Sequence, residues 1–224
     1  MGFLRIQLLL ESIVHRSLLR AGIDLVPVGD RKSHLGEIRQ SMANGMLLNG
    51  PESYQLMELV RETAKVRGDI AEVGVYRGGS AKLICSMKGD RRFHLFDTFE
   101  GLPDPGEYDS STPFRRGMYR APIECVQRNL QEFPNCIFHP GLFPDSAQDA
   151  DGVKFSFVHV DVDLYEAVAA CLSWFHPRMS PGAVLLCHDY YHAGVKRAIG
   201  EFFQEKSEPV IQQPAGSHCL FVKS

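Results

Sequence analysis

The sequence has no long apolar run. None of its stretches approaches the roughly 18 consecutive apolar residues that a membrane-spanning helix needs, so we expect no membrane span. The first apolar patch, FLRIQLLL, is interrupted by Arg5 and ends at Glu11, and no small-residue cleavage site follows it. This pattern argues against a signal peptide.

The sequence also has no paired cysteines and no excess of one charge. Its six cysteines are dispersed without a C-x-x-C pair, and several lie in apolar runs, where a free thiol packs as a small hydrophobic group. This usage indicates a reducing compartment, so we expect a cytoplasmic protein. The formal net charge is only -3, with acids and bases interspersed, which gives no electrostatic footprint for nucleic acid or an anionic membrane surface. A small molecule is the expected partner.

Internal repeats and low-complexity tracts are absent too, and 224 residues are enough for one substantial core. We predict a helical N-terminal extension over 1–67 and an α/β domain over 68–224. In the extension, an amphipathic pattern predicts a helix over 4–21, and Pro51 marks the start of another. Segment 23–50 shows no clear pattern. The first helix is expected to pack against the domain or against a second copy of the chain, as a homo-oligomer.

From residue 69 onward, short apolar runs alternate with helical patterns. The expected strands are 70–75, 92–97, 136–140, 155–161 and 182–188. The expected helices are 79–88, 122–132, 164–176 and 193–205. At the end of the chain, 209–212 and 218–222 flank a Pro-Ala-Gly turn, which predicts an antiparallel hairpin. The pattern predicts a doubly wound α/β fold with a mostly parallel, seven-stranded, Rossmann-like sheet.

A glycine-rich bend follows the first expected strand, in the segment IAEVGVYRGGS from Ile70 to Ser80. Gly74 lets the backbone pass close to a ligand, and Gly78 and Gly79 free the amides that open the next helix. Glu72, just before the bend, is an unusual residue for a buried strand end. The spacing G-x-x-x-G-G differs from the G-x-G-x-x-G that seats a pyrophosphate. A ligand without a pyrophosphate fits better, although glycine turns also occur for purely structural reasons.

Asp97 ends the second expected strand, FHLFD, at about the distance from the bend where a carboxylate accepts ribose hydroxyls. The alternative is a strand-end acid that caps a turn. The long irregular segment 98–121 follows on the same edge of the sheet, and loops of that length inside a compact domain are functional or disordered. We predict a substrate lid, with a solvated surface loop as the alternative. Its aromatic and basic side chains are Phe114, Arg115, Arg116 and Tyr119.

Four polar side chains follow two later strands. Asp161 and Asp163 come at the end of FVHVDVD, and His188 and Asp189 at the end of AVLLCHD. Period-two geometry points the first two in similar directions if the strand persists. Two carboxylates do not converge without a cation or a shared proton. The sequence therefore predicts a metal site with mostly oxygen ligands, against the alternative of helix caps and turn formers.

Six motifs occur in order between residue 46 and the C-terminal hairpin. They are MLLNGPESY (Met46 to Tyr54), GDIAEVGVYRGGS (Gly68 to Ser80), FDTFEGLP (Phe96 to Pro103), GLFPDS (Gly141 to Ser146), HVDVDLYE (His159 to Glu166) and HDYYHAGVKRAIGEFF (His188 to Phe203). In these motifs the chain resembles the macrocin O-methyltransferase (TylF-type) family. Its members are class I methyltransferases that depend on S-adenosylmethionine and magnesium.

The resemblance implies S-adenosylmethionine as the cofactor. The residues that would bind it are Glu72, Gly74, Gly78, Gly79 and Ser80 around its methionine part, Asp97 at its ribose and Gly141, in GLFPDS, near its adenine.

The resemblance also implies a magnesium ion bound by Asp161 and Asp189, with Asp163 as the base or a further ligand. The family usually has two consecutive acids where this chain has His188 and Asp189. Magnesium binds imidazole poorly. Either fewer protein ligands hold the metal, or it is another ion such as manganese, or His188 is the base, since its ordinary pKa suits proton transfer near neutrality.

The implied activity is methyl transfer to a hydroxyl group of a small molecule, expected to be a sugar of a glycosylated natural product or a polysaccharide. Arg115, Arg116 and Arg120 would favour an acidic or phosphorylated acceptor. Further candidates for the acceptor pocket are Tyr165, Tyr190, Tyr191 and His192. One alternative is a nicotinamide-dependent oxidoreductase, which predicts the G-x-G-x-x-G bend that the sequence lacks. The other is a noncatalytic cofactor-binding or assembly protein, which predicts cofactor binding without turnover.

Overall fold

The computed structural model describes residues 32–43, 45–212 and 217–224. The predicted helix over 4–21 lies outside these residues, and so does any association of two copies through it.

A seven-stranded sheet forms the centre of the molecule, in the order β3-β2-β1-β4-β5-β7-β6. The strands are β1 (Asp69–Val73), β2 (Phe93–Asp97), β3 (Cys136–Pro140), β4 (Phe155–Val160), β5 (Met179–Cys187), β6 (Ile211–Gln212) and β7 (Cys219–Val222). The first five run parallel, and β7 pairs antiparallel with both β5 and β6. The predicted doubly wound sheet with an antiparallel C-terminal hairpin is confirmed. β5 begins earlier than predicted, because Met179 still pairs with Phe155 across a register irregularity.

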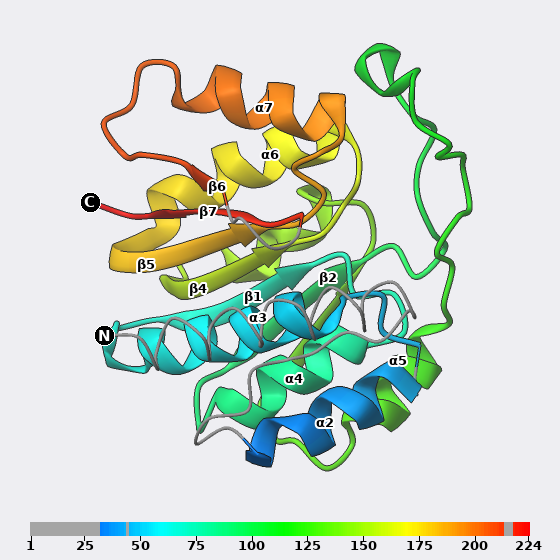
Figure 1. Ribbon diagram of the computed structural model, residues 1–224, viewed down its shortest axis with the longest axis vertical. Helices are drawn as coiled ribbons and strands as arrows, with labels where there is room; N and C mark the ends of the chain where they lie inside the picture. Colours follow the sequence, from blue (N-terminus) through cyan, green and yellow to red (C-terminus); the bar gives the residue numbers. More distant parts are fainter. Residues whose placement is uncertain (1–31, 44, 213–216) are drawn as a thin grey trace, which may run out of the picture.

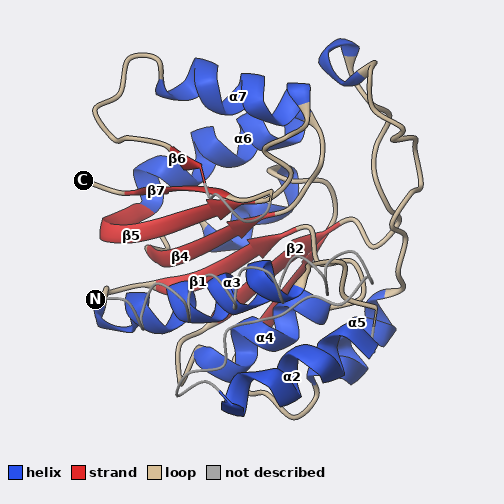
Figure 2. Ribbon diagram, in the orientation of Figure 1, coloured by secondary structure: helices blue, strands red, loops and turns tan. Residues whose placement is uncertain are grey.

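Helices cover both faces of this sheet, with α6 and α7 on one side and α2 to α5 on the other (Figures 1 and 2). The α-helices are α2 (Lys32–Ala43), α3 (Gly50–Glu62), α4 (Gly79–Met87), α5 (Ile123–Leu130), α6 (Tyr165–Phe175) and α7 (Ala193–Phe203). The 3₁₀ turns are η1 (Thr63–Lys65), η2 (Glu107–Asp109), η3 (Asp145–Ala150) and η4 (His176–Arg178). Within the described part of the chain, no helix is long and apolar enough to cross a membrane.

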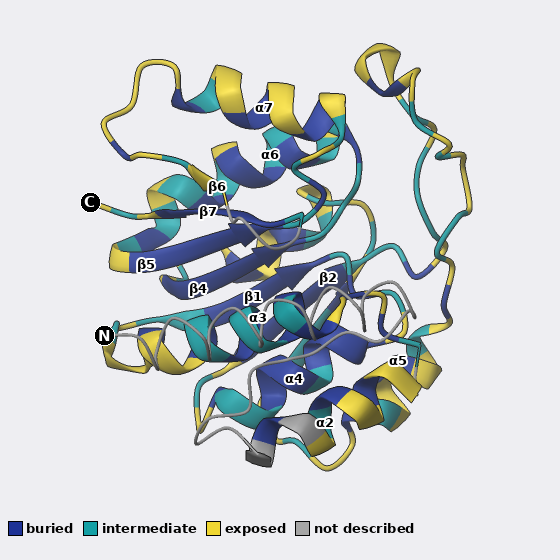
Figure 3. Ribbon diagram, viewed as in Figure 1, coloured by how far each residue is buried: buried dark blue, intermediate teal, exposed yellow. Residues whose placement is uncertain are grey.

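The core consists of two apolar layers, one on each face of the sheet (Figure 3). Parallel strands buried on both faces read as continuous apolar runs, which is why they stand out in the sequence. Phe96 and Phe155 pack under α6 and α7, while Phe157 packs on the opposite face. Leu56 and Met57 of α3 are fully buried in that second layer. The described end of the N-terminal extension therefore shares a core with the sheet.

The carboxyl ends of the parallel strands form one edge, and the loop 98–121 runs along it toward α7 (Figure 1). β1 and β4 are neighbours at the middle of the sheet, but the chain leaves them in opposite directions, toward β2 and toward β5. Ligands of open α/β sheets bind in the crevice at such a switch point. The fold thus places the candidate site at the edge where the sequence predicts it.

Candidate active site

A cavity of about 380 Å³ opens at this edge. Its wall is built by the ends of β1, β2, β4 and β5, the segment after β3, and the loop 98–121. Ligand sites for small molecules span about 300 to 1,000 Å³, so the cavity is large enough for one. The predicted site residues that line it are Gly74, Gly79, Ser80, Asp97, Gly141, Asp161, Asp163, His188 and Asp189. Glu72 and Gly78 lie outside the lining.

The glycine bend is as narrow as predicted, but its closest neighbours are protein atoms. A Cβ atom on Gly74 would lie 1.8 Å from the carbonyl oxygen of Asp161, so this glycine lets the ends of β1 and β4 approach each other. A Cβ on Gly79 would lie 2.4 Å from the Cβ of Met46. Gly78 has a φ of 79° in the left-handed region, which favours glycine. The bend brings Gly74 and Gly79 to the cavity, and Gly78 supports the turn behind it.

Asp97 fastens the bend to the end of β2. Its Oδ2 accepts hydrogen bonds from the amides of Val75, at 2.7 Å, and Tyr76, at 2.9 Å. Its Oδ1 accepts one from the amide of Phe99, at 2.7 Å. A carboxylate offers about four lone-pair sites, so Asp97 retains capacity for a further donor. Its predicted contact with a ribose stays a prediction that this geometry accommodates.

Glu72 lies in β1 and is completely buried. Its Oε1 lies 2.9 Å from Nδ1 of His159, and its Oε2 has no hydrogen-bond partner. Burial raises the pKa of Glu72, although the interaction with His159 opposes that shift. The structure places this carboxylate outside the cavity lining, and its contact with a cofactor stays a prediction.

Three acids reach the cavity from β4 and β5 by leaving strand geometry. β4 ends at Val160, so Asp163 is not two residues further along a continuing strand, as the period-two argument assumes. Asp163 has a φ of 61° and Asp189 a φ of 57°. Left-handed conformations of residues other than glycine cost free energy and concentrate at functional sites. The pKa of Asp163 is raised to about 9, first by burial and then by the negative charges of Asp161 and Asp189.

His188 lies among these acids and completes a set of donor atoms. Its Nδ1 is 3.2 Å from Oδ1 of Asp161 and 3.0 Å from Oδ2 of Asp189, yet it has no partner in hydrogen-bond geometry. Neighbouring ligands of an octahedral ion with bonds of about 2.1 Å are roughly 3 Å apart. The three side chains therefore fit a shared divalent cation, and their ligand atoms all lie within 4.8 Å of one another. An imidazole among the donors suits manganese better than magnesium.

The electrostatics of His188 are dominated by its acidic neighbours. Burial by itself lowers the pKa of a histidine, but attraction to Asp161 and contacts with Asp189 and Glu52 raise the pKa of His188 far above its ordinary value. A positive charge, on the ring or on a bound cation, is therefore strongly favoured at this point. Glu52, on α3, is a residue that the sequence analysis missed.

The loop 98–121 contributes its two predicted aromatic residues to the cavity wall, but none of its predicted arginines. Phe114 and Tyr119 line the cavity, whereas Arg115, Arg116 and Arg120 do not. Arg116 is exposed and pairs with Asp104 at 3.1 Å. The loop arginines therefore lie outside the predicted acceptor pocket.

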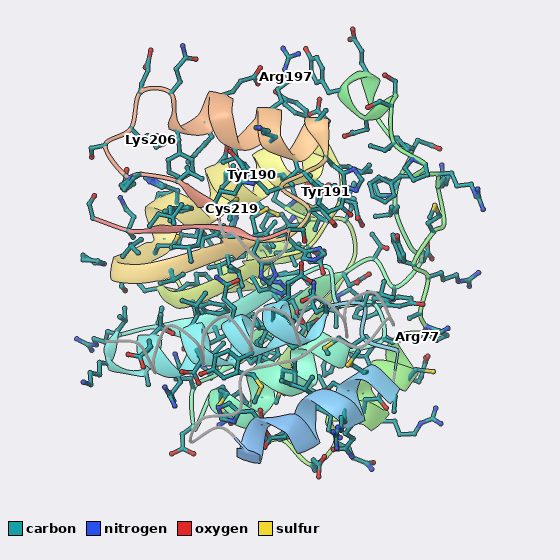
Figure 4. All side chains as sticks on the ribbon, in the orientation of Figure 1. Arg77, Tyr190, Tyr191, Arg197, Lys206 and Cys219 are labelled. Carbon is teal, nitrogen blue, oxygen red and sulfur yellow. The ribbon has the colours of Figure 1, made fainter. Side chains whose placement is uncertain are left out.

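Rings from three segments make a continuous row at the mouth of the cavity. His192 lies 4.2 Å from Tyr191 and 4.9 Å from Phe114 between ring centroids. Phe114 lies 6.4 Å from Tyr119, which lies 5.7 Å from Tyr76. Tyr191, labelled in Figure 4, is 68% exposed. Such rings can stack on the apolar face of a flat or cyclic ligand.

Two other predicted tyrosines do not line the cavity. The hydroxyl of Tyr165, on α6, donates a hydrogen bond of 2.6 Å to Oε2 of Glu201, on α7, in an exposed position. Tyr190 packs against the core under those helices. Of the four candidates for the acceptor pocket, only Tyr191 and His192 line the cavity.

The order of strands, the antiparallel finish and a cavity at the β1–β4 switch point define a class I methyltransferase fold. Residues 23–215 match the family model of macrocin-O-methyltransferase (TylF). The chain belongs to this family, which confirms the resemblance of its six motifs.

The chain is similar to two curated proteins of Streptomyces species. The chain is 31% identical to 8-demethyl-8-(2,3-dimethoxy-alpha-L-rhamnosyl)-tetracenomycin-C 4'-O-methyltransferase of Streptomyces olivaceus, over 61% of this chain and 58% of that protein. It is 30% identical to demethyldecarbamoylnovobiocin O-methyltransferase of Streptomyces niveus, over 56% of this chain and 53% of that protein. The chain thus spans little more than half the length of these relatives.

Solved structures share the fold. The O-methyltransferase NovP superposes with a TM-score of 0.69 at 24% identity, covering 77% of this chain and 79% of that one. Apo CalS11, a TDP-rhamnose 3'-O-methyltransferase of calicheamicin biosynthesis, gives a TM-score of 0.57 at 16% identity, covering 87% of this chain and 96% of that one.

Proposed function

We propose that this chain transfers a methyl group from S-adenosylmethionine to a hydroxyl group of an uncharged, sugar-bearing small molecule. The observation that carries the proposal is the single cavity where the glycine bend, Asp97 and the acids after β4 and β5 meet. Membership of the TylF family supports the reaction. The rhamnosyl group in the name of the Streptomyces olivaceus relative supports a sugar as the acceptor.

The cofactor half of the cavity follows three consecutive strands. Gly74 and Ser80 would border the methionine part, Asp97 the ribose, and the segment from Gly141 the adenine. Leu142 and Phe143 supply apolar wall in that last segment. When bound, S-adenosylmethionine supplies an electrophilic methyl group on a sulfonium, and the protein's task is to place an oxygen in line with it.

The acceptor half contains the groups that would orient and deprotonate the hydroxyl. Asp161, His188 and Asp189 would hold a divalent cation, which supplies polarisation of the acceptor hydroxyl when bound. With a pKa of about 9, Asp163 keeps its proton at neutral pH as long as nothing balances the negative charges of Asp161 and Asp189. A cation bound by those two acids would offset their charge and lower the pKa of Asp163. Asp163 would then be the carboxylate that takes the hydroxyl proton.

The charges of the lining favour a neutral acceptor. Four acids line the cavity: Asp97, Asp161, Asp163 and Asp189. None of the described lysines and arginines lines it. Phosphate and carboxylate groups are normally held by arginine or lysine. The acidic or phosphorylated acceptor suggested by the loop arginines is therefore not part of this proposal.

The test is a methyl-transfer assay with labelled S-adenosylmethionine, with and without added Mn²⁺ or Mg²⁺. One arm uses neutral rhamnosides and other glycosides, and the other uses nucleoside-diphosphate sugars. We expect label in the neutral glycosides together with an equal amount of S-adenosylhomocysteine. Cofactor binding without label in any acceptor would favour a noncatalytic binding protein, and binding of NADH in its place would favour the oxidoreductase.

A further inference from the structure

Glu52 is a buried acid that ties three elements together. It lies in the first turn of α3, where its Oε2 accepts a hydrogen bond from the amide of Asn49 at 3.0 Å. Its Oε1 accepts two from Ser217, from the amide at 2.8 Å and the hydroxyl at 3.0 Å. The carboxylate is thereby fixed between α3 and Ser217, which lies two residues before β7. Only 6% of its side chain is exposed.

This fixed carboxylate faces the site. Oε2 of Glu52 lies 3.6 Å from Nε2 of His188, on the side of the ring opposite Asp161 and Asp189. The imidazole is therefore held by negative charge at both nitrogens. Nδ1 faces the donor oxygens of the cavity, and Nε2 faces α3.

We propose that Glu52 is a positioning residue for His188, holding the ring so that Nδ1 is directed at the cation shared with Asp161 and Asp189. Metal-binding histidines commonly direct their other ring nitrogen at a carboxylate, which fixes the orientation of the ring. A histidine ring needs such an anchor more than a carboxylate does, because only one of its two nitrogens points at the ion. The inference rests on the divalent-cation site of the proposed function.

The test measures Mn²⁺ binding to the full chain, by calorimetry and by the electron paramagnetic resonance of the ion, so it does not depend on turnover. We expect Glu52→Gln to weaken Mn²⁺ binding by about 10- to 100-fold, as loss of such outer partners typically does. In a His188→Asp background, the same substitution should change Mn²⁺ affinity little, because Glu52 acts through the ring.

Asn49→Ala is the matched control. It removes the side chain that accepts from the amide of Glu52, at 2.9 Å, and leaves the carboxylate opposite His188 in place. Thermal unfolding of every variant separates loss of stability from loss of binding. We expect Asn49→Ala to lower the melting temperature while Mn²⁺ affinity stays within a few-fold.

Three results would overturn the inference: unchanged Mn²⁺ affinity in Glu52→Gln, an equal loss in Asn49→Ala, or an undiminished loss in the His188→Asp background. Absence of Mn²⁺ binding to the unmodified protein would overturn it as well. The proposed methyl transfer is judged separately, by transfer of label in the acceptor assay with and without added metal. Label transfer alongside unchanged Mn²⁺ affinity in Glu52→Gln would contradict only the role of Glu52, so the two failures are distinguishable.

Discussion

The buried carboxylate of Asp109 accepts hydrogen bonds from the backbone amide of Tyr165, at 3.1 Å to Oδ1 and 3.2 Å to Oδ2. An acid in the loop 98–121 thus caps the first turn of α6, which begins two residues after Asp163. Gly194 leaves room for it, since a Cβ there would lie 2.1 Å from Oδ1 of Asp109. Nearby, the guanidinium of Arg197, a residue of α7 labelled in Figure 4, lies over the ring of Tyr108. Its central carbon is 3.9 Å from the ring centroid. The tip of the predicted lid is therefore anchored to α6 and α7.

Replacing Asp109 with alanine should loosen this anchor. We expect a loss of about 1 to 2 kcal/mol in the free energy of unfolding, because a helix start loses its cap. The KM for the acceptor should rise more than the KM for the cofactor, since the loop carries Phe114 and Tyr119. Urea unfolding and steady-state kinetics measure these effects. Asp104→Ala, an exposed acid of the same loop, is the control and should change both little.

Asp97→Asn should weaken binding of S-adenosylmethionine by about tenfold or more. The amide can replace only part of the acceptor capacity that Asp97 offers to Val75, Tyr76 and Phe99. One hydrogen bond to a charged group contributes about 1.5 kcal/mol or more. Calorimetric titration measures the change. Glu100→Gln, an exposed substitution just after the same strand, should bind like the unmodified protein, and equal affinities of all three would contradict the placement of the cofactor.

Asp163→Asn should remove the proton acceptor without disturbing the cofactor. We expect kcat to fall by about 100-fold or more, the usual contribution of a general base, with the affinity for S-adenosylmethionine unchanged. Rapid-quench turnover and calorimetry test the two parts. If kcat stays within a few-fold of the original, Asp163 is not the group that takes the proton.

A pair of buried histidines should make the fold sensitive to acid. Nδ1 of His94 lies 2.9 Å from Nε2 of His139, and its Nε2 lies 3.1 Å from Oδ2 of Asp69. Burial lowers the pKa of both rings. Their folded-state pKa values thus lie below the unfolded value of about 6.5, and the unfolded chain binds more protons between these values. Their contribution to stability is complete above about pH 6.5 and is lost as the pH falls toward the lowered values.

His139→Gln checks this dependence. Urea unfolding between about pH 8 and pH 5 should show a shallower loss of stability in the variant, because one of the two titrating rings is gone. Identical slopes for the two proteins would show that the pair does not contribute.

Most of the fold could be predicted from the sequence because its parallel strands are buried on both faces. β3 has the predicted bounds, and the apolar runs place the other four parallel strands. α2 was not predicted, since Gly36 interrupts it and its first turn carries no acid. Such a helix is fixed by packing, here by Ile38 in the core.

The site could be predicted in part for a similar reason. Parallel strands end at one edge, so Asp97, Asp161 and Asp189 meet wherever the sheet forms. Glu52 could not be found this way, because its partner Ser217 is 165 residues away along the chain. The Asn49–Glu52 capping pattern identifies a helix start and contains nothing about His188. Asp109 was missed because its contact with Tyr165 depends on the path of an irregular loop.

The most direct test of the account is a crystal structure of the protein with S-adenosylhomocysteine and Mn²⁺. The account predicts the ligand's homocysteine part beside Gly74 and its ribose at Asp97, with the anomalous signal of manganese between Asp161, His188 and Asp189. A ligand bound elsewhere, or bound here with its sulfur directed away from these acids, would contradict it.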